Sequence, residues 1–455
     1  MFGRGRTRGS DRRAAVFAGA LLLSIAAAGC TVAASPSPAP AAAESPAATE
    51  AATPTMTPTA TPSPTKPEAA ATVPANATPA SGAWTGLRWI SDGKPAPTPE
   101  PEATKQTSGD QVFTSVSIFG WSRGYVGFDQ TETYPVDLSK PSTYSLVAES
   151  STDGLSWKRG AALQMPAGSK AVSEADTVAS IGRVVEGPGG LLAMGYGPAV
   201  ACGGPATVKG LWISTDGIVW SPVAMPFGSD GIFRIDGGGA GYIGMGQHAN
   251  GEPALWTSTD GRTWTSSTPP VSAKTGSLQD AAAFSAGFVV VGAVKGDEGC
   301  GGPSAVKPSV WWSADGKSWA RETLPGAPAA SDSWMSVSRL GDDALFAVAS
   351  TADATTQKTT TTFWTSHDGR TWARITPPAD IENFVTDGSH AIGSTFDDGN
   401  NWHFWAFEPD GSIRELAQTG TLPPSPDYGG QFALGPAGLV MRVDGDRFFL
   451  GVPTK

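Results

Sequence analysis

Six aspartates recur in one local context, where a carboxylate beside a polar turn could serve acid–base chemistry, bind a cation or fasten the turn. Five of them stand in the pattern Ser-x-Asp-Gly-x-x-Trp, and a sixth, decayed copy reads Glu-Pro-Asp-Gly-Ser-Ile-Arg. Successive copies lie 42 to 63 residues apart. We call these segments the recurring turns, and their central residues are Asp153 and Trp157, Asp216 and Trp220, Asp260 and Trp264, Asp315 and Trp319, Asp368 and Trp372, and Asp410.

The residue types of the recurring turns favour a structural role. Gly supplies the positive φ that a tight turn requires, Asp accepts hydrogen bonds from nearby backbone N–H groups, and Trp buries a large apolar surface. A calcium site is the alternative, but one carboxylate per turn is too few for a typical oxygen cage. We therefore expect these aspartates to fasten turns, and we predict no bound metal or cofactor.

No complete catalytic pattern is present elsewhere in the sequence. There is no HExxH, no phosphate-cradling Gly-Lys-Ser/Thr and no Gly-x-Ser-x-Gly. The densest polar cluster, FDDGNNW at Phe396–Trp402, is a plain turn in our interpretation, with calcium binding as the alternative. A glycosidase needs only two acids at the right separation, and a sequence does not show which acids converge. We predict no catalytic residue, and a divergent glycoside hydrolase remains the alternative.

Short strands must position the recurring turns. Most copies follow an extended segment that ends in Trp two residues ahead of the Ser position, and a further extended segment follows each complete copy. Each turn is therefore predicted to join two strands of a β-hairpin. Upstream lies a turn followed by an apolar run, such as GYIGMG from Gly241, and an extended segment precedes that run. Four antiparallel strands repeated at this period predict a β-propeller.

The sequence contains seven of these upstream apolar runs and six recurring turns. We therefore predict an all-β propeller of seven four-stranded blades, with six as the alternative. The last unit lacks its outer hairpin. WTGLRWIS, at residues 84–91, repeats the Trp-x-Ser pattern and is predicted to supply the missing strand, which closes the ring and covers its edges. The predicted parts are a closing strand at 82–93, a Pro-rich linker at 94–110 and the propeller at 111–455.

The N-terminal segment reads as an export signal. Arginines precede an apolar run that is too short to span a bilayer comfortably and that ends at Cys30. The ending Ala-Ala-Gly-Cys resembles the lipobox of bacterial lipoproteins; an ordinary signal with a chance cysteine is the alternative. The resemblance implies removal of residues 1–29, a lipid on Cys30 and an outward-facing position on the cell membrane, at the cell surface or in the periplasm. Residues 30–81, rich in Ala, Pro, Ser and Thr, are predicted to be a disordered stalk.

The net charge of the chain indicates which classes of partner to expect. The net charge is −11 and no basic stripe is present, so we expect no nucleic-acid partner. This acidity discourages adhesion to anionic lipid headgroups, so the lipid alone would hold the chain at the membrane.

Cys202 and Cys300 lie in matching contexts, CGGPA and CGGPS, within the two longest repeat intervals. We predict a disulfide between them, with two free thiols or an intermolecular pair as alternatives.

The pattern Ser-x-Asp-Gly-x-x-Trp resembles the Asp-box, or BNR repeat, found in sialidases, the sortilin ectodomain and some glucan hydrolases. The resemblance covers roughly residues 112–415 and implies a β-propeller whose ligand site lies on the face opposite the turns. It constrains fold more than function. Sialidases use an arginine cluster and a Tyr–Glu pair. FRID, at Phe233–Asp236, is similar to a sialidase segment but departs at Asp236.

Arg234 is therefore expected to be an ordinary inner-strand arginine, and Tyr428 has no glutamate in a convincing partner motif. We predict a binding module without catalysis, for a glycan or a protein ligand, at the face that carries the Cys202 and Cys300 loops. A purely structural assembly factor is a third possibility. We expect a monomer, because a closed ring leaves no sheet edge that needs a partner.

Overall fold

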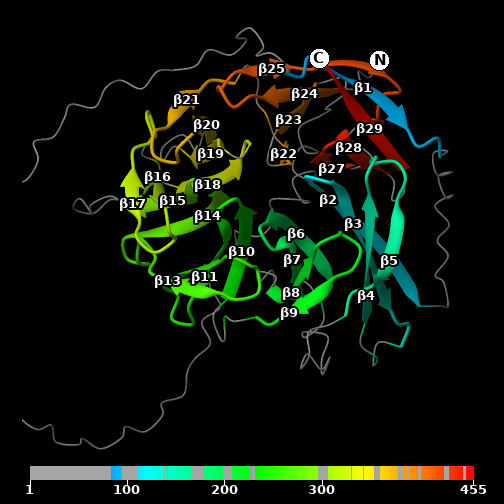
Figure 1. The fold of residues 1–455 in the computed structure, drawn as a ribbon, viewed down its shortest axis with the longest axis horizontal. Coiled ribbons are helices and arrows are strands. Elements are labelled where there is room, and N and C mark those ends of the chain that lie inside the picture. The colour runs from blue at the N-terminus through cyan, green and yellow to red at the C-terminus, as the bar shows by residue number, and fades with distance from the viewer. Residues whose placement is uncertain are drawn as a thin grey trace, which may run out of the picture. The chain divides into compact units, whose positions relative to one another are not determined.

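β-Strands form all the regular secondary structure that the computed structural model describes (Figure 1). The description covers residues 83–94, 110–137, 140, 142–164, 178–197, 208–225, 227, 231–295, 306–328, 330, 332–341, 343–352, 359–377, 381, 383–387, 390–397, 401–424, 430–443 and 447–455. All of these residues belong to one compact unit. Within these ranges, no helix has the length and apolar character needed to cross a membrane.

The strands form seven sheets, and six of them contain four antiparallel strands in chain order. The first three blades are β2 (Gln111–Trp121), β3 (Gly124–Tyr134), β4 (Thr143–Ser151) and β5 (Lys158–Ala162); β6 (Ser180–Gly187), β7 (Gly190–Tyr196), β8 (Val208–Ser214) and β9 (Ser221–Val223); and β10 (Gly231–Gly238), β11 (Gly241–Gln247), β12 (Pro253–Ser258) and β13 (Thr265–Ser267).

The next three blades follow the same order. They are β14 (Gly276–Phe284), β15 (Gly287–Lys295), β16 (Val306–Ser313) and β17 (Ala320–Glu322); β18 (Asp332–Arg339), β19 (Leu345–Ala352), β20 (Thr359–Ser366) and β21 (Ala373–Ile375); and β22 (Asn383–Thr386), β23 (Ala391–Phe396), β24 (Trp402–Phe407) and β25 (Ile413–Glu415). The first strand of each blade is its inner strand, nearest the centre of the ring in Figure 1.

The seventh blade joins the two ends of the propeller. Its sheet order is β26 (Ala417–Gly420), β1 (Gly86–Ser91), β29 (Arg447–Thr454), β28 (Gly438–Val443) and β27 (Gly430–Gly435). The N-terminal strand β1 pairs antiparallel with β29, from Gly86 opposite Thr454 to Ser91 opposite Phe449. The predicted seven blades and the closing N-terminal strand are therefore confirmed. The fifth strand, β26, was not predicted, and it pairs parallel with the outer edge of β1.

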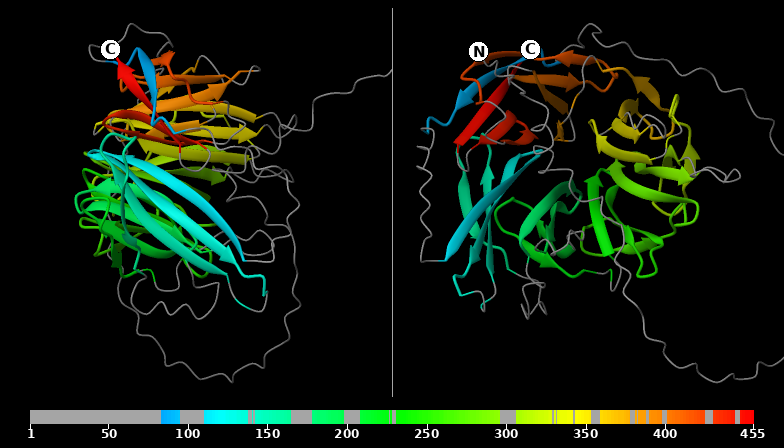
Figure 2. Two further views of the ribbon diagram at one scale, coloured as in Figure 1. Left: turned by 90° about the vertical axis from the view of Figure 1, so that its right-hand side faces the viewer. Right: turned by 180° about the vertical axis from the view of Figure 1, so that it is seen from behind.

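Seven apolar clusters fill the spaces between neighbouring blades, one cluster at each junction of the ring. The cluster between the seventh and first blades joins Val440 and Leu450 to Ile118 and Tyr125. Each sheet therefore buries both faces against its neighbours, which explains why the central strands read as nearly continuous apolar runs. Figure 2 shows the same sheets from the side and from behind.

Candidate functional site

The turn at Asp260 shows how one of the repeated carboxylates is bonded. It accepts hydrogen bonds from the Ser258 hydroxyl at 3.0 Å and from the N–H groups of Arg262 and Thr263 at 2.8 and 2.7 Å. The bonds from the Thr263 and Arg262 backbone lower the pKa of Asp260 to about 2, because they stabilise the charged form. Gly261, at φ 72°, donates its N–H to the Ser258 hydroxyl. The carboxylate is thus engaged by groups of its own turn.

The other complete copies repeat this arrangement. In each, the aspartate accepts a bond from the preceding Ser hydroxyl and from two following N–H groups, and the pKa of each aspartate is lowered; these residues are Asp153, Asp216, Asp315 and Asp368. In the decayed copy, Asp410 accepts one backbone bond within its turn, from Ser412 at 2.9 Å.

The tryptophan that ends each complete turn packs between its own blade and the preceding one. Trp157 stacks on Phe448 of the seventh blade with ring centroids 4.9 Å apart, and Trp220 lies 5.2 Å from Phe128 of the first blade. Trp264, Trp319 and Trp372 lie in the clusters between the second and third, third and fourth, and fourth and fifth blades. These side chains therefore belong to the core of the ring.

Strand directions place the recurring turns of the first six blades at the same face of the ring, which we call the turn face. Tyr242, near the start of β11, pairs with Ser258 at the turn, whereas the far end of β11 pairs with the start of β12, Gln247 opposite Pro253. Connections between the second and third strands therefore begin and end at the opposite face. Cys202 and Cys300 stand in two such connections, residues 198–207 and 296–305, which lie outside the described residues.

Inner strands approach one another closely near the turn face. A Cβ atom on Gly120 of β2 would collide with the Leu434 carbonyl oxygen of β27, and one on Gly238 of β10 would collide with the Ala283 carbonyl oxygen of β14. Glycine is needed at both positions because a neighbouring backbone occupies the space of a side chain. This close approach favours the opposite face as the side from which a ligand would reach the inner strands.

Three consecutive inner strands carry a β-bulge at the same point. The pairing register shifts across Gly182 in β6, across Phe233 in β10 and across Gln279 in β14. A bulge changes the direction of neighbouring side chains. The residues that follow the three bulges are Arg183, Arg234 and Asp280, and all three are charged.

These charged residues form ion pairs between successive blades. The Arg183 Nη2 atom lies 2.7 Å from Asp236 Oδ2, so β6 is bonded to β10. Arg234 binds Asp280 through two parallel bonds of 2.5 and 2.6 Å, which join β10 to β14. Asp280 also accepts the Val337 N–H of β18 at 3.2 Å. We call Arg183, Asp236, Arg234 and Asp280 the inner-strand ion pairs.

Burial shifts the pKa values of two residues in the inner-strand ion pairs, Asp236 and Arg234. Asp280 is 1% exposed, whereas the Arg234 side chain is 30% exposed. Burial raises the pKa of Asp236, and the charges of Arg183 and Arg339 oppose that rise. Burial also lowers the pKa of Arg234, and the like charge of Arg183 adds to the effect. The four inner-strand ion-pair residues are formally neutral together, and Arg339 adds one positive charge that acts on Asp236.

Two exposed aromatic side chains stand toward the opposite-face ends of inner strands. Phe233, the bulged residue of β10, is 39% exposed, and Trp334 of β18 is 43% exposed. The Tyr196 hydroxyl donates to the Phe233 carbonyl at 3.3 Å, which connects the end of β7 to the bulge. Phe233 thus lies on β10 beside Arg234 and Asp236, and Trp334 lies on β18, whose Val337 N–H binds Asp280.

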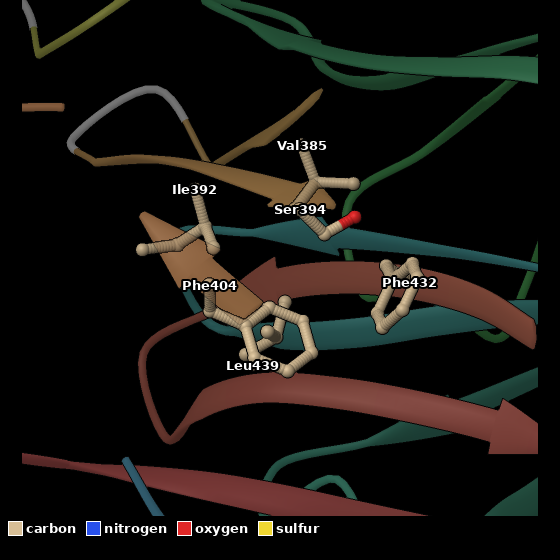
Figure 3. A pocket seen from close by; sticks show the side chains of 6 residues that line it. All are labelled: Val385, Ile392, Ser394, Phe404, Phe432 and Leu439. Atoms are coloured by element: carbon tan, nitrogen blue, oxygen red, sulfur yellow. The ribbon is translucent and has the colours of Figure 1, made fainter. Parts of the chain in front are cut away.

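A small apolar cavity lies between the sixth and seventh blades (Figure 3). Its volume is about 10 Å³, which holds at most about one water molecule. Its lining residues are Val385, Ile392, Ser394, Phe404, Phe432 and Leu439. It is too small for a sugar, and it is separate from the inner-strand ion pairs.

Several residues singled out in the sequence fall beyond the described ranges, namely Cys30, Cys202, Cys300 and Tyr428. The polar segment Phe396–Trp402 connects β23 to β24, and Asp397 accepts the Asn401 N–H at 2.9 Å. In the part of the chain that is described, no group of three His, Cys, Asp or Glu side chains is placed to hold a metal ion.

The ion pairs of Arg183 and Asp280 were missed by sequence reasoning, although a pattern was present. Ile181-Gly182-Arg183, Ile232-Phe233-Arg234 and Leu278-Gln279-Asp280 share an apolar residue, a variable residue and a charged residue. They stand at equivalent points of three consecutive repeats. This shared pattern becomes visible when the repeats are aligned on their inner strands instead of on the recurring turns.

Comparison with known proteins gives likeness of fold alone. No protein-family model and no curated protein sequence matches the chain. Among solved structures, an acylaminoacyl peptidase of Pyrococcus horikoshii is 10% identical with a TM-score of 0.41, over 74% of this chain and 52% of that chain. This chain therefore spans about half the length of that peptidase.

Two further similar structures are proteins that act on or bind carbohydrates, according to their names. A putative glycoside hydrolase of Parabacteroides distasonis is 11% identical with a TM-score of 0.30, over 58% of this chain and 87% of that chain. The fucose-specific lectin of Aleuria aurantia is 9% identical with a TM-score of 0.35, over 68% and 97%.

Proposed function

We propose that this chain is a lipid-anchored, extracytoplasmic β-propeller of the Asp-box type that binds a glycan or protein ligand without catalysis. The repeated turn geometry from Asp153 to Asp368 supports the Asp-box assignment. The sequence around Cys30 supports the lipid anchor. The ligand would bind at the opposite face, since the inner strands crowd together near the turn face.

The exposure of Phe233 and Trp334 is the observation that carries the binding role. Aromatic side chains present large, rigid apolar surfaces, and they are enriched among the residues that dominate binding energy. Covering their exposed apolar surface with a ligand would contribute favourable free energy. We infer that these two residues contact the ligand.

The bonding of the inner-strand ion pairs argues against catalysis by those residues. Both Arg234 nitrogens that contact Asp280 are already committed to a carboxylate, so they are poorly placed to receive a substrate carboxylate. Asp280 is bonded to a guanidinium and to a backbone N–H. These contacts fit a role in holding three blades in register.

A glycoside hydrolase is the second candidate, and one observation favours it. Asp236 is buried with a pKa raised by burial, which is the property of a general acid, and the negative charge of the neighbouring Asp280 adds to that rise. Glycosidases use two carboxylates that flank the scissile bond. Under this alternative, Asp236 would donate the proton and Asp280 would be its partner.

Binding and hydrolysis assays on the full-length chain in detergent separate the two candidates. We expect glycan-array or partner-capture signal that falls in Phe233→Ala and Trp334→Ala, and no release of reducing sugar from any arrayed glycan. Asp236→Asn should leave binding unchanged. Sugar release that is lost in Asp236→Asn would establish the enzyme instead.

Membrane fractionation tests the anchor separately. Cys30→Ala should move the protein from the membrane fraction to the soluble fraction, because the lipid is the proposed attachment. A variant that stays wholly in the membrane fraction would refute the lipid assignment.

A further inference from the structure

The first blade extends beyond the length of its neighbours. Strands β2 and β3 have eleven residues each, whereas the inner strands of the next two blades have eight (cyan strands in Figure 2). The end of the blade that includes this added length consists of residues 111–115 of β2, which pair with 130–134 of β3. All five of these β2 residues are exposed. We call this part the blade extension.

The edge of the blade extension that can accept another strand is the side of β2 that faces away from β3. β2 is the end strand of its sheet. Nearer the turn face, the Ile118 N–H points away from β3, because it donates to the Gln431 side chain of β27 at 3.2 Å. Residues two apart in a strand point their N–H groups the same way, so the Thr114 and Val112 N–H groups also point away from β3.

Natural sheets protect such edges with proline, lysine, bulges or a covering segment. The edge sequence Gln-Val-Phe-Thr-Ser, Gln111 to Ser115, contains neither proline nor lysine, and its pairing with β3 is regular. It also exposes large apolar side chains, since Val112 is 60% and Phe113 is 55% exposed. An exposed, regular and apolar edge of this kind is a site for strand addition.

One face of the blade extension combines aromatic rings with a carboxylate. Phe113 lies opposite Glu132, and Glu132 lies opposite Tyr144 on β4. Tyr134 meets Phe113 edge to face with ring centroids 5.4 Å apart. Aromatic faces and a carboxylate together attract a cationic group. The exposed Asp110 at the start of the edge adds negative charge.

We propose that the blade extension binds an extended, basic segment of a partner protein by strand addition to β2. The backbone of that segment pairs with the outward N–H and C=O groups of Val112 and Thr114. An arginine or lysine of the segment lies against Phe113 and Tyr134 and faces Glu132. This surface is separate from the aromatic residues of the inner strands, so it stands independently of the proposed ligand site.

Two matched synthetic peptides test the proposal on the full-length chain in detergent. Both alternate valine and threonine; one carries a central arginine and the other a central glutamate. Thr114→Pro removes an outward N–H without removing a bond to β3, because proline is tolerated at a strand edge. Thr114→Val keeps that N–H and is the control. Thermal unfolding of each variant establishes that it is folded.

We expect the arginine peptide to bind, as measured by fluorescence anisotropy, and more tightly than the glutamate peptide. Thr114→Pro should weaken binding of the arginine peptide by about fivefold or more, the effect of about one lost hydrogen bond, and Thr114→Val should not. Glu132→Gln should weaken the arginine peptide selectively. Trp334→Ala should have no effect on either peptide.

Three results would overturn the proposal. Equal binding of the two peptides would remove the basic specificity. Unchanged binding in a folded Thr114→Pro variant would remove strand addition. Self-association of the chain that Thr114→Pro abolishes, without peptide binding, would identify a second copy of this chain as the occupant.

Discussion

The hydrogen bonds to Asp260 predict how much stability the protein loses when this carboxylate is removed. The decayed turn at Asp410, whose carboxylate accepts fewer bonds, serves as a comparison. Asp260→Ala removes the acceptor for the Ser258 hydroxyl and for the Arg262 and Thr263 N–H groups. Because both N–H donors are exposed, water can replace the lost acceptor, and the cost resembles that of deleting a helix cap. We expect a loss of about 1.5 kcal/mol in the free energy of unfolding. Asp410→Ala removes one backbone bond and should cost about 0.5 kcal/mol.

Urea unfolding of both variants and the wild type measures these differences. At a slope of about 3 kcal/mol per molar, Asp260→Ala should lower the midpoint by about 0.5 M with the slope unchanged. The loss should also depend on pH. The folded pKa of Asp260, about 2, lies below its unfolded value of about 3.9, so its stabilisation is present above about pH 4 and is lost as pH falls toward 2.

Two results would refute this reasoning. An Asp410→Ala loss as large as that of Asp260→Ala would show that the number of bonds to the carboxylate does not set the cost. A gap between wild type and Asp260→Ala that stays constant from about pH 5 to about pH 2 would show that the charged carboxylate is not the stabilising species.

Three further predictions concern the ring. Arg234→Met should destabilise the fold by about 3–5 kcal/mol in urea unfolding, because Asp280 stays buried without its guanidinium; Arg234→Met with Asp280→Leu should restore part of the loss. Trp89→Ala should cost about 3–5 kcal/mol in the same assay, because the indole is 1% exposed beside Phe404. If Cys202 and Cys300 are bonded, non-reducing peptide mass spectrometry should find the linked pair, and reduction should cost about 4–5 kcal/mol.

The propeller architecture was predictable because each repeat contains the local sequence signals of one blade. The period of the Asp-Gly turns gives the blade spacing, and the upstream runs give the count. Trp89 and Ser91 repeat a pattern that otherwise precedes the recurring turns, which placed the N-terminal strand in the ring. These features depend on neighbouring residues within one hairpin, so a sequence displays them directly.

Features that depend on how blades meet were not predictable in the same way. Arg234 was considered by itself, but its partner Asp280 belongs to the next blade, and only the packed ring brings the two together. β26 is a short polar strand with no alternating pattern. Its pairing with β1 joins residues 331 positions apart in sequence, such as Gly86 and Ala417, and no local signal specifies the register.

The position of β1 between two strands gives the ring a mechanical property. Tension applied through the N-terminal segment enters the ring at Gly86, and β1 is bonded along its length to β29 on one side and to β26 on the other. β29 is held to the rest of the ring through β28, which pairs with it up to Arg447 near the far end of β1. A pull along the axis of β1 therefore loads its hydrogen bonds together in shear, instead of opening them one after another. The strand that closes the ring is therefore placed to resist extraction under load.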